Sequence, residues 1–296
     1  MIKFVNAKIN LGLQIVRRRQ DGYHDLQTLF YPVGLKAGTP ANPVEFCDIL
    51  EICRSDSERP FTLVTTGRAV DCAPEKNLVW RAAEEYFRLR PSADFAVSIR
   101  LDKHLPDGAG MGGGSADAAF TLAMIDSLAR EHDPDAGLSP GELASAALRL
   151  GADCPFFLIN RPAYAEGVGE RLEEIPLDLS GMWLGVAKPA VSVSTREAFA
   201  GVRPRPSTFD LRTLPDIPVA DWSHVVVNDF EESIFPQYPL LADIKAAFYE
   251  AGALYASMTG SGSCIYGLWP TRDEAREAML EIARNPTITH TYLLEL

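Results

Sequence analysis

Residues 106–115 read PDGAGMGGGS, and they run directly into ADAAFTLAMIDSLARE at residues 116–131. Glycine lets the backbone approach a bulky anion closely and adopt positive φ. The second stretch predicts a helix, because its apolar residues recur at helical spacing. The first N–H groups of a helix have no partner within it, and they lie at the positive end of its dipole. Loop and helix together therefore predict a phosphate-binding site.

Two other glycine-rich motifs fit this loop less well. Gly108, Gly110 and Gly113 have the G-x-G-x-x-G spacing of dinucleotide-binding folds, but Lys103–Asp107 separates the loop from the strand predicted before it. The acidic residues about 20 positions further on lie in a polar turn rather than at a strand end. A Walker A motif needs a lysine directly before Ser115, where this chain has a glycine. A dinucleotide-dependent oxidoreductase is thus the weaker alternative.

The bulk composition limits the class of protein. The chain has 296 residues, of which 47% are hydrophobic and 23% charged, so we expect a globular protein with two domains. Its net charge of −12 disfavours nucleic acid or an anionic membrane as a partner, although a small anionic ligand needs only local positive charge. Five scattered cysteines indicate neither a disulfide framework nor a zinc site.

The opening segment carries no targeting pattern. Asn6, Lys8, Asn10 and Gln14 interrupt its apolar run, which is unlike a signal peptide, and no stretch has the length of a membrane span. We therefore expect a cytoplasmic protein without a membrane partner.

Strands and helices alternate along both halves of the chain. Periodicity predicts strands at residues 9–15, 49–53, 61–65, 95–101, 183–187 and 264–268. Helices are predicted at residues 77–89, 240–251 and 271–283 and from Ser139, which has capping-box spacing to Glu142. We place the domain boundary near residue 160.

Three segments resemble the motifs of one kinase superfamily, which includes galactokinase, homoserine kinase and mevalonate kinase (the GHMP kinases). They are AKINLGL at residues 7–13, PDGAGMGGGSADAA at 106–119 and SMTGSGSCIYGL at 257–268. A narrower resemblance, to diphosphocytidyl-methylerythritol kinases, includes the run Asp21-Gly22-Tyr23-His24. It extends to LGADCPFF at residues 150–157, AEGVGE at 165–170 and NDFEES at 228–233. Four residues depart from the commonest pattern of that family: Asn6, Met111, Ala116 and Thr259.

The resemblance implies a fold and a reaction. The fold class is α+β, with an N-terminal α/β domain at residues 1–160 that carries the glycine-rich loop and a C-terminal domain at 161–296 built from an antiparallel sheet with helices. The implied reaction is ATP-dependent phosphorylation of the 2-hydroxyl of a cytidine-diphosphate-linked methylerythritol, in the non-mevalonate route to isoprenoid precursors. Another kinase of the superfamily, with a sugar, homoserine or mevalonate substrate, is an alternative, as is a non-catalytic nucleotide sensor. A homodimer is compatible with either.

The resemblance also assigns roles to residues. Asp153 would be the general base and Lys8 its electrostatic partner, although each residue read alone is ordinary. The residues implied at ATP are Pro106, Gly108, Gly110, Gly112, Gly113, Gly114 and Ser115. The hydroxyl of Ser115 is also the candidate ligand for Mg²⁺. The residues implied at the acceptor are Asn10, Tyr23, His24, Thr195, Phe199, Gly260 and Gly262, with Tyr23 and Phe199 stacking on cytosine and His24 reading its edge.

Overall fold

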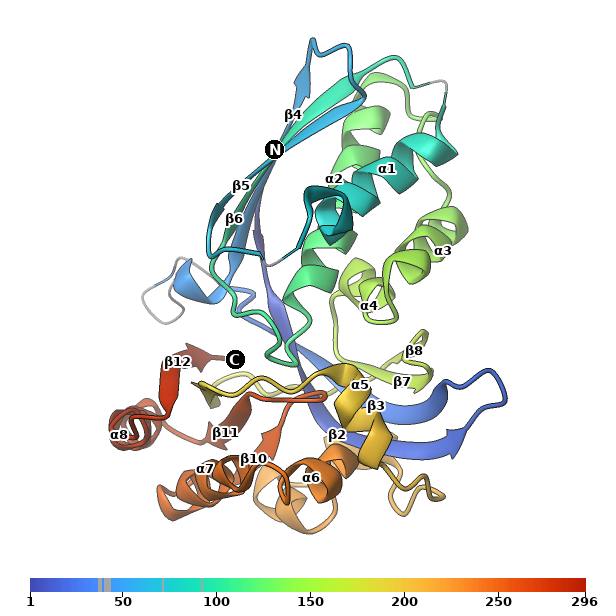
Figure 1. The fold of residues 1–296 in the computed structure, drawn as a ribbon. Helices are drawn as coiled ribbons and strands as arrows, with labels where there is room; N and C mark the ends of the chain where they lie inside the picture. The colour runs from blue at the N-terminus through green and yellow to red at the C-terminus, as the bar shows by residue number, and fades with distance from the viewer. Residues whose placement is uncertain (37–38, 40–43, 71, 92) are drawn as a thin grey trace. The chain divides into compact units, whose positions relative to one another are not determined.

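The computed structural model describes residues 1–36, 39, 44–70, 72–91 and 93–296 (Figure 1). The chain forms two compact units. The first comprises Met1–Ala7, Val44–Asp107 and Gly112–Asn160, and the second comprises Lys8–Pro43, Gly108–Met111 and Arg161–Leu296. The domain boundary that we placed near residue 160 stays a prediction. The two compact units do not divide at that residue alone, because residues 8–43 and 108–111 belong to the second unit.

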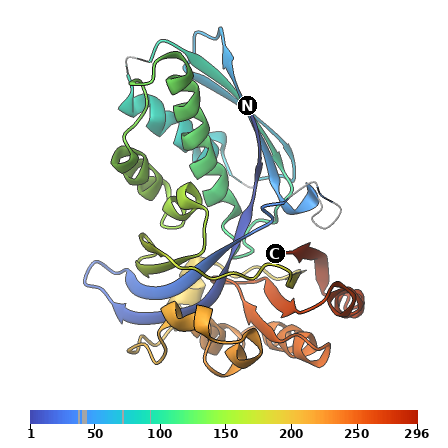
Figure 2. The ribbon, with the colours of Figure 1, turned by 180° about the vertical axis from the view of Figure 1, so that it is seen from behind.

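The first unit is a mixed sheet covered by helices. Its strands β1 (Ile2–Val5), β4 (Asp48–Ser55), β5 (Phe61–Gly67) and β6 (Ala96–Lys103) have the order β1-β4-β6-β5, and only β5 and β6 pair in parallel. The helices α1 (Leu78–Leu89), α2 (Gly113–His132), α3 (Pro140–Leu150) and α4 (Cys154–Ile159) lie on one side of this sheet (Figures 1 and 2). Short 3-10 turns occupy Val44–Phe46 and Pro74–Lys76.

The second unit contains two four-stranded sheets. Strands β2 (Ala7–Arg18), β3 (His24–Val33), β7 (Ala163–Gly167) and β8 (Arg171–Glu174) form the first in the order β2-β3-β7-β8. Strands β9 (Trp183–Pro189), β10 (Tyr255–Met258), β11 (Ile265–Trp269) and β12 (Ile288–Glu295) form the second, which is antiparallel throughout. The predicted antiparallel sheet with helices is confirmed, whereas the first sheet was not foreseen.

Helices complete the second unit. They are α5 (Thr195–Gly201), α6 (Asp229–Ile234), α7 (Pro239–Glu250) and α8 (Arg272–Ile282), with 3-10 turns at Leu211–Asp216 and Val219–His224. Helix α7 packs on β10 and β11, and α8 packs on β9, β11 and β12. Their apolar faces form a core that includes Phe248, Ile265 and Trp269. This core supports the turn between β10 and β11, which is the third of the motifs quoted above.

Most local predictions are confirmed, with small shifts at the ends. The capping box of Ser139 and Glu142 is present at α3, and Pro140 occupies the first turn. Helix α2 begins at Gly113, inside the glycine-rich stretch and before the predicted helical stretch at residues 116–131. Along β2 the polar residues Asn10 and Gln14 are as buried as their apolar neighbours, so both faces of this strand are covered.

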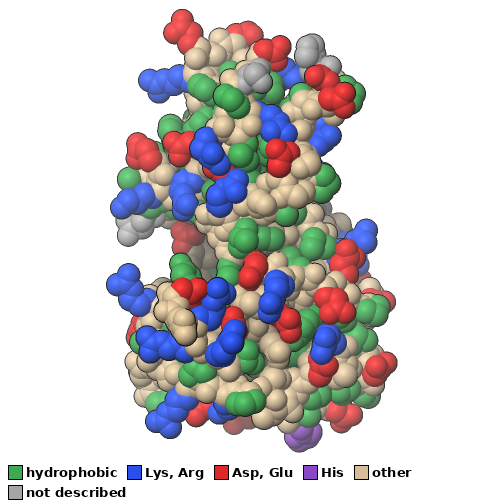
Figure 3. Space-filling view, turned by 90° about the vertical axis from the view of Figure 1, so that its right-hand side faces the viewer, with side chains coloured by type: hydrophobic (Ala, Val, Ile, Leu, Met, Phe, Trp, Pro, Cys, Tyr) green, Lys and Arg blue, Asp and Glu red, His purple; other side chains and the backbone are tan. Residues whose placement is uncertain are grey.

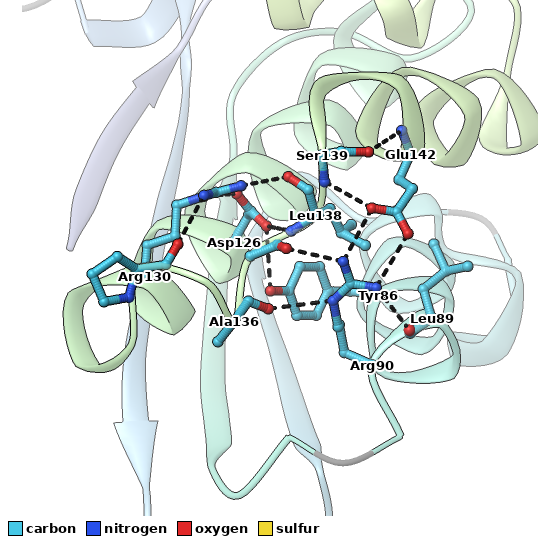
Figure 4. A network of polar contacts seen from close by, with 11 residues as sticks. Tyr86, Leu89, Arg90, Asp126, Arg130, Ala136, Leu138, Ser139 and Glu142 are labelled. Carbon is cyan, nitrogen blue, oxygen red and sulfur yellow. Dashed lines mark hydrogen bonds and ion pairs between the residues drawn. The ribbon is translucent and has the colours of Figure 1, made fainter.

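Polar contacts fasten the helices of the first unit to one another (Figure 4). The carboxylate of Asp126 on α2 accepts hydrogen bonds from the backbone N–H of Leu138 at 2.5 Å, Nε of Arg130 at 2.8 Å and the hydroxyl of Tyr86 on α1 at 3.4 Å. Arg90, after α1, donates to both carboxylate oxygens of Glu142. The helices are therefore held by polar contacts, some buried and some exposed, as well as by apolar packing.

Figure 3 shows one face of the molecule with its side chains coloured by type. Lys and Arg side chains alternate there with Asp and Glu, and hydrophobic side chains lie between them in small groups. Among the residues that the structure describes, no helix combines the length and the apolar character needed to cross a membrane.

We expect Asp126→Ala to destabilise the protein by about 2–4 kcal/mol, because it leaves the N–H of Leu138 and the hydroxyl of Tyr86 buried without an acceptor. Urea unfolding would measure the change. Asp135→Ala, which removes an exposed carboxylate from the turn after α2, is the matched control and should stay within about 0.5 kcal/mol of wild type. Equal stability of the two variants would contradict the expectation.

Candidate active site

The glycine-rich loop adopts the backbone that its sequence predicts. Gly108, Gly110 and Gly112 have positive φ of 60°, 74° and 72°. Gly112 occupies the N-cap position of α2, so Gly113 and Gly114 form the first turn of the helix. The unpaired N–H groups at the start of α2 therefore follow the loop directly, as a phosphate-binding role requires.

Within the second unit, two glycine turns lie against each other. A Cβ on Gly110 would lie 2.0 Å from the carbonyl oxygen of Thr259, and a Cβ on Gly260 would lie 2.9 Å from the carbonyl oxygen of Gly110. Both positions have positive φ, so a larger residue meets strain as well as collision. These glycines are needed for the close contact between the loop and the β10–β11 turn.

The hydroxyl of Thr259 joins the three motifs. It accepts a hydrogen bond from the backbone N–H of Asn10 at 3.2 Å and lies 3.1 Å from the carbonyl oxygen of Gly110, to which it donates. Thr259 is fully buried. The segments quoted at residues 7–13, 106–119 and 257–268 thus meet at one side chain, which sequence reasoning treated as a mild departure.

The NDFEES segment holds the β10–β11 turn in place. The side-chain amide of Asn228 donates to the carbonyl oxygens of Met258 at 2.7 Å and Gly260 at 2.9 Å. The carboxylate of Glu231 accepts from the hydroxyl of Ser257 and the N–H of Met258. Sequence reasoning used this segment only as a family resemblance and assigned it no role. The amide of Asn228 and the carboxylate of Glu231 here satisfy backbone groups that a tight turn leaves unpaired.

Lys8 is buried on β2, with 3% of its surface exposed. Its Nζ donates to Oδ1 of Asn10 at 2.6 Å and lies 4.9 Å from the centre of the Phe30 ring. The amide nitrogen of Asn10 donates to the hydroxyl of Thr28 at 2.9 Å. Both ends of the Asn10 side chain thus make contacts within the unit, and its role at the acceptor stays a prediction.

Asp153 stands immediately before α4 in the first unit, where its side chain does not cap the helix. Nearby, the hydroxyl of Ser115 hydrogen-bonds the thiol of Cys154, and a Cβ on Gly151 would lie 3.7 Å from that hydroxyl. Burial raises the pKa of Cys154 to about 12, so the thiol is neutral and is not a nucleophile. The predicted pair takes Asp153 from the first unit and Lys8 from the second, and it stays a prediction.

A buried ion cluster lies beneath the start of α2, and sequence reasoning missed it. Nζ of Lys103 is 2.5 Å from Asp48 and 2.9 Å from Asp117. Burial alone would lower the pKa of Lys103, but the two carboxylates hold it above its usual value. Burial, followed by the charge of Asp48, raises the pKa of Asp117, whose Oδ1 has no hydrogen-bond partner.

The cluster explains the positions of two charged residues. Asp117, on α2, forms an ion pair with Lys103 inside the unit. Lys103 continues the buried alternation of Val97, Ile99 and Leu101, and this pattern was the signal that the lysine faces the core. A Cβ on Gly113 would lie 3.5 Å from its Nζ, so the ammonium supports the first turn after the loop.

Two of the residues predicted at cytosine lie in contact. The rings of His24 and Phe199 are stacked, with centroids 4.9 Å apart and planes 18° apart, and Phe230 makes a perpendicular contact with Phe199. Burial, with a contribution from Arg18, lowers the pKa of His24, so the imidazole is neutral at pH 7. Tyr23 is 65% exposed, and Thr195 is exposed at the first position of α5. Phe199 thus has an aromatic partner in His24, and the roles of Tyr23, His24 and Phe199 at cytosine stay predictions.

Comparisons with known proteins agree with this arrangement. The profile of the GHMP kinases N terminal domain matches residues 77–161, and that of the GHMP kinases C terminal matches residues 219–286. The chain is 45% identical to the 4-diphosphocytidyl-2-C-methyl-D-erythritol kinase of Bacteroides thetaiotaomicron, over 91% of this chain and 92% of the relative. It is 34% identical to the kinase of the same name from Citrifermentans bemidjiense, over 94% and 92%.

The chain belongs to the 4-diphosphocytidyl-2-C-methyl-D-erythritol kinase family.

Solved structures give the same result. A crystal structure of 4-(cytidine 5'-diphospho)-2C-methyl-D-erythritol kinase is similar with a TM-score of 0.80 and 31% identity, over 99% of this chain and 98% of that one. The mevalonate kinase of Methanococcus jannaschii shares the fold at a TM-score of 0.69 and 12% identity, over 100% and 98%. The two-domain α+β fold and the kinase class predicted from the sequence are confirmed.

We expect Gly110→Ala to lower kcat/KM for ATP by about 100-fold. A Cβ at this position would lie 2.0 Å from the carbonyl oxygen of Thr259, so the loop must shift, and catalysis is sensitive to small displacements of the groups that position the reactants. ADP release with the acceptor of this kinase family would measure it. Gly108→Ala separates collision from strain. Gly108 also has positive φ, but the nearest atom to its Cβ would be 3.9 Å away, so the loss should be smaller.

Gly141→Ala is the matched control, since nothing lies within 4 Å of a Cβ there. It should retain wild-type kcat/KM. Wild-type turnover in a folded Gly110→Ala variant, checked by circular dichroism, would show that the close contact of the two turns is not required.

Proposed function

We propose that this chain transfers the γ-phosphate of ATP to the 2-hydroxyl of 4-diphosphocytidyl-2-C-methyl-D-erythritol, in the non-mevalonate pathway to isoprenoid precursors. The names of its relatives supply the acceptor. The structural observation that carries the proposal is the meeting of three motifs at Thr259, which brings the glycine-rich loop, strand β2 and the β10–β11 turn together. A kinase needs such a junction, because phosphoryl transfer depends mainly on the position of its reactants.

The triphosphate of ATP would bind at the loop and at the start of α2. The positive φ of Gly108, Gly110 and Gly112 turns the backbone there without side chains in the way. Gly113, Gly114 and Ser115 offer the free N–H groups of the first helical turn, and Pro106 restricts the entry to the loop. The positive end of the helix dipole adds to the attraction.

Asp153 would act as the general base. The acceptor oxygen would bond to the γ-phosphorus of ATP while the bond between that phosphorus and the oxygen bridging the β- and γ-phosphates breaks. ADP would leave with the bridging oxygen, and the proton of the acceptor hydroxyl would pass to the carboxylate of Asp153. Lys8 would stabilise the negative charge that develops, a role that suits an ammonium fixed by Asn10 and Phe30. Asn10, Gly260 and Gly262 remain the candidates for holding the acceptor next to these groups.

Mg²⁺ would accompany ATP. In the described part of the chain no group of three or more His, Cys, Asp or Glu side chains could hold a metal ion. This fits a Mg²⁺ that keeps water and phosphate ligands and takes at most one or two from the protein. The hydroxyl of Ser115, in the first turn of α2, is the candidate protein ligand. When bound, the ion would neutralise part of the phosphate charge.

The cytosine of the acceptor would bind at Phe199. Its contact with His24 supports this role, because aromatic surface that can stack on a base is already assembled there. Tyr23, which is mostly exposed, is free to cover the base, and Thr195 lies one turn before Phe199 on α5. The neutral imidazole of His24 can donate from one nitrogen and accept at the other, as reading a base edge requires.

The protein would work in the cytoplasm on small molecules, as a monomer or a homodimer. Assays with galactose, homoserine and mevalonate as acceptors would separate this function from those of other superfamily members. A non-catalytic sensor would bind ATP without releasing ADP. Turnover with the cytidyl acceptor alone is the result expected.

We expect Asp153→Asn to lower kcat by a factor of about 10² to 10⁴, the usual contribution of a general base, with little change in either KM. Steady-state ADP release would measure both constants. Asp135→Asn, at an exposed position in the turn after α2, makes the same chemical change as a control and should keep kcat within about 3-fold of wild type. A near-normal kcat in Asp153→Asn would remove Asp153 from the reaction.

Loss of the ring in Phe199→Ala should raise the KM of the cytidyl acceptor by about 5- to 150-fold and leave the KM of ATP unchanged, since stacking on one base contributes about 1–3 kcal/mol. Phe199→Tyr, which keeps the ring, should retain most of the affinity. The melting temperature of each variant would separate binding from packing, because Phe199 also contacts the core. An equal rise in both KM values would place Phe199 in the core alone.

A further inference from the structure

Lys188, the next-to-last residue of β9, is a buried cation whose ammonium group donates three hydrogen bonds. It is 6% exposed. Its Nζ donates to the carbonyl oxygens of Pro189 at 3.0 Å and Val191 at 2.9 Å and to the hydroxyl of Ser263 at 3.0 Å. The hydroxyl of Ser263 donates in turn to the carbonyl oxygen of Val191 at 2.6 Å. An ammonium has three donors, so its hydrogen bonding is complete.

The contacts that the structure describes for Lys188, in contrast, include no group that balances its charge. Among the described residues its partners are two carbonyl oxygens and one hydroxyl, with no carboxylate. The titratable group beside Lys188 is the thiol of Cys264. Burial raises the pKa of this thiol to about 12, so the thiol is neutral and supplies no negative charge. The buried Lys103 has two carboxylates at its ammonium. A buried ammonium without a counter-charge costs several kcal/mol, and the described contacts do not offset it.

Lys188 connects three segments of the second unit. These are the end of β9, residues 190–194 that lead into α5, and the turn that carries Gly260 and Gly262. Two of them also touch the glycine-rich loop. The N–H of Cys264 donates to the carbonyl oxygen of Ala109 at 3.4 Å, and a Cβ on Gly108 would lie 3.9 Å from the hydroxyl of Ser192. The ammonium therefore lies directly behind the segments that border the loop.

We propose that Lys188 is a positioning residue whose charge is balanced by a bound phosphate ester at the glycine turns. The inference rests on the proposed function, in which both substrates carry phosphate groups. The ammonium fixes the turn at Ser263 through hydrogen bonds and attracts the anion through its charge. The anion comes either from the triphosphate of ATP or from the diphosphate of the cytidyl acceptor, and binding measurements distinguish the two.

Variants at position 188 separate charge from hydrogen bonding. Lys188→Gln removes the positive charge but keeps a hydrogen-bond donor. Lys188→Met removes both the charge and the donor, whereas Lys188→Arg keeps both the charge and hydrogen-bond donors. Lys36→Gln removes the same charge at an exposed position and controls for the change in net charge. The measurements are kcat and KM for each substrate at low and high salt, and the rise in melting temperature that ADP or CDP produces.

We expect both neutral variants to fold and to show a KM raised by about 10- to 30-fold for one phosphate ester or both, with a smaller change in kcat. The corresponding rise in melting temperature should shrink, and Lys188→Arg and Lys36→Gln should stay within about 3-fold of wild type. Effects on ATP and ADP alone assign the anion to the triphosphate. Effects on the acceptor and CDP alone assign it to the diphosphate.

Three outcomes would overturn the proposal. One is wild-type KM and wild-type thermal shifts in the neutral variants. Another is equal damage in Lys188→Arg and Lys188→Gln, since geometry rather than charge would then matter. The third is loss of folding in both neutral variants, because the hydrogen bonds alone would then explain the lysine. Turnover by the wild type tests the proposed function separately, and a thermal shift with ADP tests Lys188 even without turnover.

Discussion

The contact between Gly110 and Thr259 is the constraint on which the second unit depends. Two backbone segments approach so closely that no Cβ fits at Gly110, and the carbonyl of Gly110 still requires a donor. The hydroxyl of Thr259 meets that requirement and also accepts from Asn10 on β2. Because Thr259 is rigidly branched and fully buried, its hydroxyl has one position, and Asn228 secures the turn on either side of it. The hydrogen bonds of the Thr259 side chain thereby fix the relative positions of three segments that are far apart in the sequence.

Burial, rather than net charge, decides where this acidic chain is positive. Of 28 basic residues in a protein of net charge −12, Lys8, Lys103 and Lys188 are buried, and each has a different environment. Lys103 has two carboxylates, Lys8 has an amide and an aromatic ring, and Lys188 has carbonyl and hydroxyl groups. Low-dielectric surroundings strengthen the field of a buried ammonium, although the two carboxylates offset that field at Lys103. Anionic substrates are thus compatible with a negative surface, because a few desolvated cations act at short range.

Local features of the sequence were more predictable than contacts across it. Alternation located β2, β4, β5, β6, β9 and β11, and apolar spacing or capping residues located α1, α3 and α8, because these signals act within a few residues. No strand was predicted at β1, β3, β7, β8, β10 or β12. The sheet that joins β3 to β7 was missed, since its register pairs Leu26 with Gly167 and no local pattern encodes that contact. The alternation of β6 indicates that Lys103 faces the core, but it does not indicate the partners Asp48 and Asp117, which come from elsewhere in the first unit. The glycines of the loop were predictable as flexible positions, whereas the carbonyl that Gly110 must avoid was not.

The stacking of His24 on Phe199 bears on how the proposed site would recognise a base. The imidazole occupies one face of the phenyl ring, and its low pKa keeps it uncharged, so the contact is between two neutral rings. In the proposed site, stacking on Phe199 would add affinity for any base, because every base has an aromatic face, so stacking would not by itself select cytosine. Selectivity would then come from the groups that meet the edge of the base. The neutral imidazole of His24 offers one donor and one acceptor for that edge, and a base that cannot match them would leave polar groups unpaired. The edge of the base, more than its face, would therefore decide which nucleotide is accepted.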